Sequence, residues 1–213
     1  MYYWNYIDGS WVPSASGKVF KSINPATGEE IGEVTQSTPD DVAAACDAAA
    51  RAYDGWRRTP APRRGEILFR AGEILMRRKD ELARLMTMEM GKVIKEACGD
   101  VQEAIDMAFY MGGEGRRSFG YTTPSELPNK FAMAVRDPVG VVAVITPWNF
   151  PLAIPGWKIF PAVVLGNTVV YKPSSETAIT SSMIVRVLEE AGLPPGVLNL
   201  VQGPGATIGA ALV

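Results

Sequence analysis

Three short apolar runs in the second half of the chain constrain its fold more than any other feature. They cover residues 139–145, 168–171 and 197–201 and follow one another at intervals of about 30 residues. Two segments with a helical pattern, residues 152–164 and 178–191, lie between them. Strands that are buried on both faces and separated by helices form a parallel sheet with right-handed crossovers. The sequence therefore predicts an α/β fold in which helices flank a parallel sheet.

A small β region is expected at the amino end, and a hairpin near the middle of the chain. Residues 5–35 are short segments divided by turn signals, of which Asp8-Gly9 is the strongest. Residues 118–137 contain many turn formers and then alternate between apolar and other side chains. This pattern predicts an extended β-hairpin that protrudes from the body of the protein.

Three helices are expected between these two β segments. Thr38 has the side chain of an N-cap, and Pro39 after it suits the first position of a helix. A second helix is predicted over residues 62–90, with Gly91 as its C-cap. A third is predicted over residues 92–110, ending in a pair of glycines.

The length of 213 residues allows one large domain or two small ones, and no internal repeat is visible. The last residues have the pattern of a further helix after only three sheet strands. Because parallel sheets usually contain more strands, we expect the sheet to continue beyond Val213.

The absence of histidine excludes several chemistries within these residues. Ser-His-Asp triads, Cys-His pairs and His-ligated metals cannot form. The two cysteines, Cys46 and Cys98, are too few for a four-cysteine zinc site and indicate a reducing compartment. We therefore expect no metal site and a cytoplasmic location.

Charge and hydropathy argue against two classes of partner. The net charge of −2 provides no basic excess for a nucleic acid backbone. Residues 138–157 carry no charge, but four prolines interrupt them, so that a lipid-exposed helix would lose too many hydrogen bonds. We expect neither a membrane span nor a secretory signal, because the first residues lack a basic and an apolar region.

Polar side chains follow each of the three predicted strands. Ligands bind beyond the carboxyl ends of strands in open parallel sheets, so residues 145–151, 171–175 and 202–205 should face one side. Asn149 lies in a proline-flanked loop, where its amide suits an oxyanion hole. The alternative is that Asn149 only stabilises its own turn, as asparagines often do.

Two further features of these loops have alternative interpretations. Lys172 follows a buried strand, where its charge must meet either solvent or an anionic ligand. The run from Gly203 to Gly209 has the form of a glycine-rich turn that enters a helix and cradles phosphate. It follows the third strand rather than the first, which favours a role in helix packing.

The cysteines and the paired arginines have structural interpretations. Cys46 and Cys98 lie on apolar faces of predicted helices without a nearby base, so we expect small hydrophobes rather than nucleophiles. The pairs Arg57-Arg58 and Arg63-Arg64 are expected to form a solvated face around a helix start.

Five sequence motifs in their order and spacing resemble the aldehyde dehydrogenase superfamily. These are Ile23-Asn-Pro-Ala-Thr-Gly28, Glu89-Met-Gly-Lys92, Thr146-Pro-Trp-Asn-Phe-Pro-Leu152, Gly166-Asn-Thr-Val-Val-Tyr-Lys-Pro173 and Ala191-Gly-Leu-Pro-Pro-Gly-Val197. The resemblance covers the whole chain and the amino-terminal portion of a typical member. Residues 153–158 and 113–116 are most similar to the dehydrogenases of 2-oxoglutarate semialdehyde and succinic semialdehyde.

The resemblance implies a Rossmann-like sheet and assigns roles to the loop residues. Residues 1–117 would be the β and helical part of a cofactor-binding domain, 118–138 an oligomerisation hairpin, and 139–213 its incomplete βαβ part. Asn149 would help to hold the aldehyde oxygen as an oxyanion. The NAD or NADP groove would be lined by Ile145, Thr146, Pro147, Trp148, Asn149, Lys172, Ser174, Ser175 and Gly205.

Ser175 bears on the choice between the two cofactors. Many members that prefer NAD have glutamate there, and its carboxylate would repel a 2′-phosphate. A serine removes that charge, so the resemblance implies that NADP is tolerated, although a shift of the turn would bring the Glu176 carboxylate back. The alternative is that Ser175 merely caps the helix that begins near Thr177.

The resemblance also implies a reaction that these residues do not complete. The family oxidises an aldehyde, here a semialdehyde, to a carboxylate through a cysteine thioester. Its nucleophilic cysteine, general-base glutamate and pyrophosphate turn match nothing in this sequence, so we expect these 213 residues to be inactive by themselves. A dimer or tetramer is expected for the full-length enzyme. The competing hypothesis is a non-catalytic module that binds nucleotide weakly or only packs.

Overall fold

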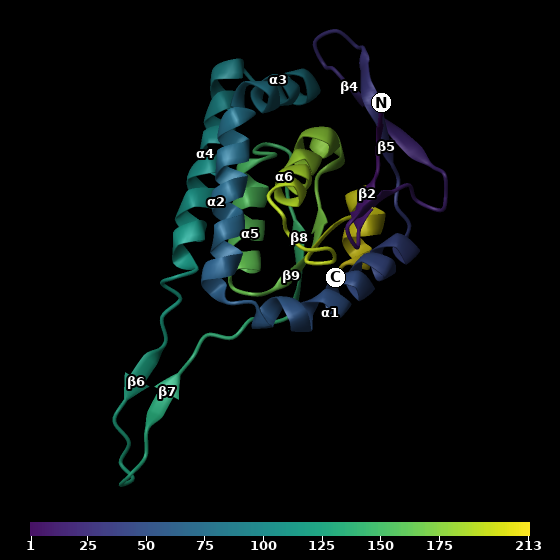
Figure 1. The fold of residues 1–213 in the computed structure, drawn as a ribbon. Helices are drawn as coiled ribbons and strands as arrows, with labels where there is room; N and C mark the ends of the chain where they lie inside the picture. The colour runs from purple at the N-terminus through teal and green to yellow at the C-terminus, as the bar shows by residue number, and fades with distance from the viewer.

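The centre of the structure, a computed structural model that describes residues 1–213, is a five-stranded sheet (Figure 1). Its strands, in spatial order, are β3 (Ser10–Val12), β2 (Asn5–Ile7), β10 (Leu198–Leu200), β9 (Thr168–Lys172) and β8 (Val141–Ile145). Strand β9 pairs in parallel with both β8 and β10, which confirms the predicted parallel core.

Helices cover both faces of this sheet, as expected. In β9 the side chain of Val170 packs with helix α1 (Pro39–Arg58), whereas its neighbours Val169 and Tyr171 belong to the larger core on the opposite face. Because side chains alternate along a strand, consecutive residues serve the two cores in turn. The large core is shared with α5 (Ala153–Val164) and α6 (Ala178–Glu190).

The amino-terminal β region contributes more than the sequence indicated. Asp8 and Gly9 both have positive φ and close the predicted hairpin between β2 and β3. Strand β2 then pairs antiparallel with β10, so the hairpin extends the main sheet. The remaining strands β1 (Tyr2–Tyr3), β5 (Glu30–Thr35) and β4 (Val19–Ile23) form a separate sheet in that order. The expected domain boundaries after residues 117 and 138 stay predictions.

The long helix predicted over residues 62–90 is two helices in the structure. Helix α2 (Ala61–Arg77) ends at Arg78, and α3 (Lys79–Met90) then takes a different direction (Figure 1). The turn allows α3 to pack against both α4 (Ile94–Glu114) and α6, which a straight continuation would pass by. Gly91, with φ of 72°, ends α3 as expected.

The start of α1 agrees with the sequence-based prediction, whereas the end of α4 does not. Thr38 and Asp41 form a reciprocal capping box at the start of α1, which confirms the predicted N-cap. Helix α4 continues past the glycine pair that was expected to end it. Gly112 lies instead where α4 crosses α2, and a Cβ there would lie 2.9 Å from the ring of Phe69.

Arg64 contradicts the interpretation of the paired arginines as a solvated face. Its side chain is only 7% exposed and has no acidic partner, whereas Arg63 is exposed beside Glu66. The Arg64 guanidinium donates to the carbonyl oxygens of Val164, at 2.8 Å, and Arg57, at 3.2 Å. These carbonyls are at the carboxyl ends of α5 and α1, where helix geometry leaves them without partners. Arg64 therefore joins two helix ends.

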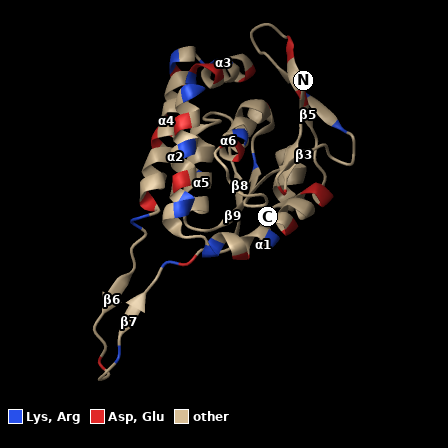
Figure 2. Ribbon diagram, in the orientation of Figure 1, with Lys and Arg blue, Asp and Glu red and all other residues tan.

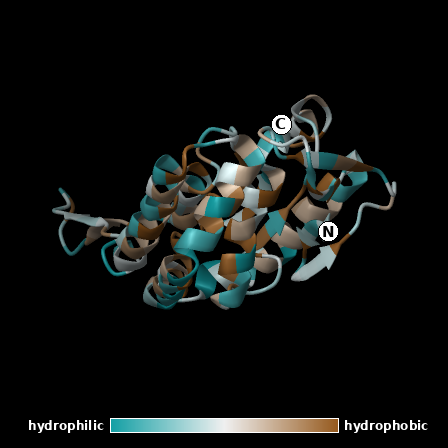
Figure 3. Ribbon diagram, turned by 90° about the horizontal axis from the view of Figure 1, so that it is seen from above, coloured by the Kyte–Doolittle hydropathy of each residue, from teal (hydrophilic) through white to brown (hydrophobic).

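The predicted hairpin protrudes from the body (Figure 1) and consists of β6 (Tyr121–Thr123) and β7 (Ala132–Ala134) in antiparallel register. Its charged residues lie near its tip and base, while the outer helices carry charges along their length (Figure 2). The hairpin exposes several large apolar side chains, namely Phe119, Tyr121, Phe131, Met133 and Val135. Seen from above, the most hydrophobic segments gather in the helices and strands of the body (Figure 3). None of the helices combines the length and the apolar character that crossing a membrane requires.

We expect Arg64→Met to lower the free energy of unfolding by about 2–3 kcal/mol, because buried carbonyl oxygens lose their donor. Arg63→Met is the matched control and should change it by less than about 0.5 kcal/mol, since an exposed ion pair contributes little. Urea unfolding followed by circular dichroism measures both. Equal losses in the two variants would contradict the role assigned to Arg64.

We expect this chain to self-associate through the unpaired edge of strand β8. It pairs only with β9, and Val141 on it is 42% exposed. Unpaired strand edges pair readily with other chains, and a charge on the edge suppresses this. Sedimentation velocity should show concentration-dependent association that Val141→Lys weakens and Val93→Lys, on an exposed loop, does not. A monomer at every concentration would refute the prediction.

Candidate functional site

The loops after β8, β9 and β10 meet around one cavity, at the carboxyl ends of the strands. Its volume is about 580 Å³, within the range of small-molecule sites. The predicted residues that line it are Ile145, Thr146, Pro147, Lys172, Ser174, Ser175 and Gly205. Phe20, Gln36, Glu176 and Pro204 complete the lining. Phe20 and Gln36 come from the amino-terminal β region and had no signal in the sequence.

Lys172 is buried in the wall of this cavity, so it is not the solvated lysine that one interpretation of the sequence allowed. Its residue is 3% exposed, and its ammonium group donates to the carbonyl of Pro173 at 2.5 Å. No carboxylate pairs with it, and burial lowers its pKa from the ordinary value. A buried cation that lacks a counter-charge is costly unless a ligand supplies acceptors. The position therefore fits a ligand with hydroxyl or anionic oxygens.

Ser174 and Ser175 have different structural roles, and neither serine has the role as cap of α6 that the sequence suggested for Ser175. Ser174 is the N-cap of a short 3₁₀ turn, Ser175–Thr177, that leads into α6, and its Oγ accepts from the backbone N–H of Glu176 at 3.3 Å. The alternative interpretation of Ser175 as the cap is therefore wrong. The Ser175 hydroxyl instead donates to the carbonyl of Gly203 at 3.1 Å and ties the second loop to the third. The Glu176 side chain is exposed at the rim of the cavity.

Gly205 begins a short π-helical turn, Gly205–Gly209, that enters the last helical segment. Ile208 in this turn is buried against Val42 and Ala45 of α1, which bears out the interpretation as helix packing. A Cβ on Gly205 would contact nothing within 4 Å, so packing inside this chain does not require glycine. The missing side chain leaves this wall of the cavity open. A phosphate-binding role for the turn stays a prediction.

Asn149 and Trp148 line a second hollow of about 550 Å³, and not the strand-end cavity. Asn149 is exposed there, and its side-chain amide makes no hydrogen bond within the chain. The interpretation of Asn149 as the stabiliser of its own turn therefore lacks the bond that would support it. The amide is available to a ligand, while Trp148 also borders a third hollow next to Ser175.

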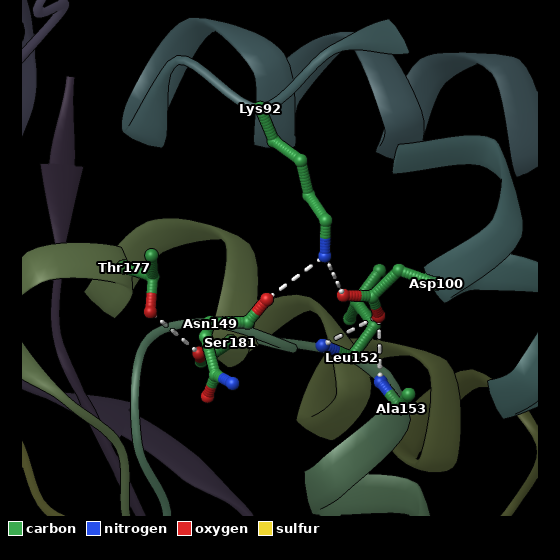
Figure 4. A network of polar contacts seen from close by, with 7 residues as sticks. All are labelled: Lys92, Asp100, Asn149, Leu152, Ala153, Thr177 and Ser181. Atoms are coloured by element: carbon green, nitrogen blue, oxygen red, sulfur yellow. Dashed lines mark hydrogen bonds and ion pairs between the residues drawn. The ribbon is translucent and has the colours of Figure 1, made fainter. Parts of the chain in front are cut away.

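A buried ion pair that sequence reasoning missed lies next to the Asn149 loop (Figure 4). The ammonium of Lys92 is 3.1 Å from Oδ2 of Asp100 and donates to the backbone carbonyl of Asn149 at 2.8 Å. Oδ1 of Asp100 accepts from the backbone N–H groups of Leu152, at 3.3 Å, and Ala153, at 2.8 Å. Burial raises the pKa of Asp100, whereas the Ala153 N–H and the Lys92 ammonium oppose the rise.

Glu89 does for α6 what Asp100 does for α5. Its buried carboxylate accepts from the backbone N–H groups of Ile179, at 2.8 Å, and Thr180, at 2.6 Å. It also accepts from the Ser22 hydroxyl at 3.1 Å, and burial raises its pKa. Glu89 and Lys92 belong to one motif that was visible in the sequence. Only the structure shows that Glu89 holds the start of α6, while Lys92 holds the Asn149 loop and pairs with the carboxylate that holds the start of α5.

The cysteines remain poor nucleophile candidates. Both are free and half-buried, on helices α1 and α4, and burial raises the pKa of the Cys46 thiol. A raised pKa disfavours the thiolate that nucleophilic attack requires. The structure has no group of three or more Cys, Asp and Glu side chains placed to hold a metal ion.

The fold and the cavity together define a parallel α/β domain with a hollow of ligand size at the carboxyl ends of its strands. A family model described as "Aldehyde dehydrogenase family" matches residues 11–213, and the chain belongs to that family. This membership confirms the resemblance seen in the five motifs.

Curated relatives are similar over nearly the whole chain. Alpha-ketoglutarate semialdehyde dehydrogenase of Haloferax volcanii is 47% identical over 210 residues, which cover 98% of this chain and 44% of that protein. Alpha-ketoglutaric semialdehyde dehydrogenase of Bacillus subtilis is 46% identical over 211 residues, 99% of this chain and 43% of that protein. The chain thus spans less than half the length of these relatives.

Solved structures show the same arrangement. An NADP-dependent enzyme from E. coli matches with a TM-score of 0.95 at 37% identity, over 98% of this chain and 43% of that one. Betaine aldehyde dehydrogenase from Staphylococcus aureus, solved with NAD⁺, matches with a TM-score of 0.95 at 35% identity over the same shares of the two chains. These matches confirm the predicted fold class.

Proposed function

We propose that residues 1–213 form the cofactor-binding part of an enzyme that oxidises a semialdehyde to a carboxylate with NAD⁺ or NADP⁺. The observation that carries the proposal is the buried, unpaired ammonium of Lys172 in a cavity formed by three strand ends. The names of the relatives support a semialdehyde substrate such as alpha-ketoglutarate semialdehyde. We call the protein of family length that carries these residues the whole enzyme.

The residues of the strand-end cavity fit a dinucleotide. Lys172 offers its ammonium to the hydroxyls of the adenosine ribose, and Gly205 leaves room at the adenine end. Ser174 and Ser175 border the ribose, while Ile145, Thr146, Pro147 and Trp148 line the groove toward Asn149. When bound, NAD(P)⁺ supplies the hydride acceptor. The choice between the two forms rests on the charge near Ser175, where a hydroxyl stands in place of a carboxylate.

Asn149 is proposed as the residue that binds the reacting aldehyde. Its free amide N–H donates to the carbonyl oxygen, and the bond strengthens as negative charge develops on that oxygen. The nucleophilic cysteine and the general-base glutamate are assigned to the remainder of the whole enzyme. Cys46 and Cys98 do not serve, because they are half-buried on helices without a base. On this proposal residues 1–213 are inactive by themselves.

The protruding hairpin is proposed to contact another copy of the enzyme, in a dimer or tetramer. Its exposed apolar side chains extend away from the body and lie outside both hollows of the site. A cytoplasmic location rests on the two free cysteines alone. The second candidate function, a non-catalytic module that binds nucleotide weakly or only packs, rests on the expectation that residues 1–213 carry no nucleophilic cysteine and no general base. It predicts that the whole enzyme has no turnover.

We expect Asn149→Ala to lower kcat of the whole enzyme by about 10²–10³, the effect of losing one oxyanion donor. Cofactor affinity should change by no more than a few fold. Asn24→Ala is the matched control, because Asn24 does stabilise its own turn, through the Ala26 N–H at 2.9 Å, and should alter stability alone. Steady-state kinetics with 2-oxoglutarate semialdehyde measure kcat and KM. A change confined to KM would reduce Asn149 to a turn-former.

We expect Ser175→Glu to shift the ratio of kcat/KM for NAD over NADP by roughly tenfold, or about 1.4 kcal/mol. The new carboxylate repels a 2′-phosphate, which carries about −1.5 to −2 charges at neutral pH. Ser175→Gln is the matched control, since it has the same size, lacks the charge and loses the same bond to Gly203. If both variants shift the ratio equally, shape rather than charge determines the cofactor.

A further inference from the structure

We propose that Lys92 and Asp100 are positioning residues that hold the Asn149 amide in its working direction. This inference rests on the proposed role of Asn149 and adds two residues that act through the backbone of its loop. Lys92 lies in the turn between α3 and α4, Asp100 lies in the first half of α4, and both side chains point toward the loop that joins β8 to α5 (Figure 4).

Lys92 and Asp100 bind the loop between β8 and α5 at two points. At the first, Lys92 holds the backbone carbonyl of Asn149 itself, at 2.8 Å. Its ammonium also lies 3.9 Å from the centre of the Phe150 ring, which adds a cation–π contact. At the second, Asp100 holds the N–H groups of Leu152 and Ala153, at the first turn of α5. The residues between these points form a turn that leads into α5, and the carbonyl of Phe150 already accepts from the N–H of Ile154 at 3.1 Å.

Because both charged groups are buried, they keep the hydrogen-bond partners that the loop provides. The side chain of Lys92 is 9% exposed and that of Asp100 is fully buried, so water competes little for either charge. Each group is therefore committed to the acceptors and donors that the loop offers. The Asn149 amide, by contrast, makes no bond of its own within the chain. Its direction is consequently determined by its backbone, which Lys92 holds.

A misplaced oxyanion donor loses most of its effect, because a shift of about 1 Å can cost up to a hundredfold in rate. We therefore expect Lys92→Met to lower kcat of the whole enzyme by roughly 10–100-fold. Lys92→Arg, which keeps a charged donor, should recover part of the loss. Lys79→Met is the matched control: this lysine also binds α4, through Gln102 at 2.6 Å, but lies away from the loop, and its loss should leave kcat unchanged.

A double-mutant cycle separates positioning from general stability. In an Asn149→Ala background, Lys92→Met should lower kcat by less than about twofold, because the donor it positions is already gone. Equal losses in both backgrounds would overturn the inference while leaving the proposed role of Asn149 intact. If Asn149→Ala alone has no effect on kcat, the proposed function fails instead, so the two failures are distinguishable.

Hydrogen–deuterium exchange of the whole enzyme provides a readout that does not depend on turnover. Lys92→Met and Asp100→Asn should each speed exchange in peptides that cover residues 146–154, with little change in peptides from the hairpin or α1. Lys79→Met should leave the 146–154 peptides as they are. Unchanged exchange of this loop in both Lys92→Met and Asp100→Asn would overturn the inference, even if kcat falls.

Discussion

The structure depends on two buried carboxylates that hold the amino ends of helices α5 and α6. Asp100 accepts from the first turn of α5 and Glu89 from the first turn of α6, so each satisfies N–H groups that helix geometry leaves unpaired. A buried carboxylate is costly unless it is hydrogen-bonded, and a helix end supplies both donors and a favourable dipole. The carboxylate thus satisfies the unpaired N–H groups of the helix end, and these N–H groups offset the cost of burying the carboxylate. Because the loops of the candidate site lead directly into these two helices, the same contacts determine where the site residues lie.

The site itself divides into a part that the protein completes and a part that it leaves open. The hydroxyls of Thr146, Ser174 and Ser175 all have partners within the chain. The bonds of Thr146 to Tyr171 and of Ser175 to Gly203 tie the three strand ends together, and Ser174 caps the turn after β9. Two other groups are less fully satisfied. Lys172 is a buried cation that has a backbone carbonyl but no carboxylate as partner, and the side-chain amide of Asn149 makes no hydrogen bond within the chain. Polar groups left unpaired inside a well-bonded frame are those that a ligand can use. This contrast, rather than the size of either hollow, supports the assignment of both residues to binding.

Errors in prediction occurred where a distant part of the chain overrides a local pattern. The apolar periodicity over residues 62–90 is continuous, yet the helix breaks at Arg78 because α3 must reach α4 and α6. Arg64 belongs to a pair of arginines that looks solvated, but its neighbours in space are the ends of two helices, one of them 100 residues further along the chain. No local signal distinguishes Arg64 from Arg63, because the difference lies entirely in which face of α2 meets α5.

The sequence by itself determined the elements whose causes are local. Apolar runs alternating with helical segments specified the parallel sheet, Thr38 and Gly91 specified helix ends, and Asp8-Gly9 specified a hairpin, because each depends on neighbouring dihedral angles and hydrogen bonds. It also placed the candidate residues in three loops. Only the tertiary structure decided that Lys172 is buried and that Lys92 and Asp100 lie next to the Asn149 loop. Burial and ion pairing depend on segments far apart in sequence, and no short-range pattern encodes which of them meet.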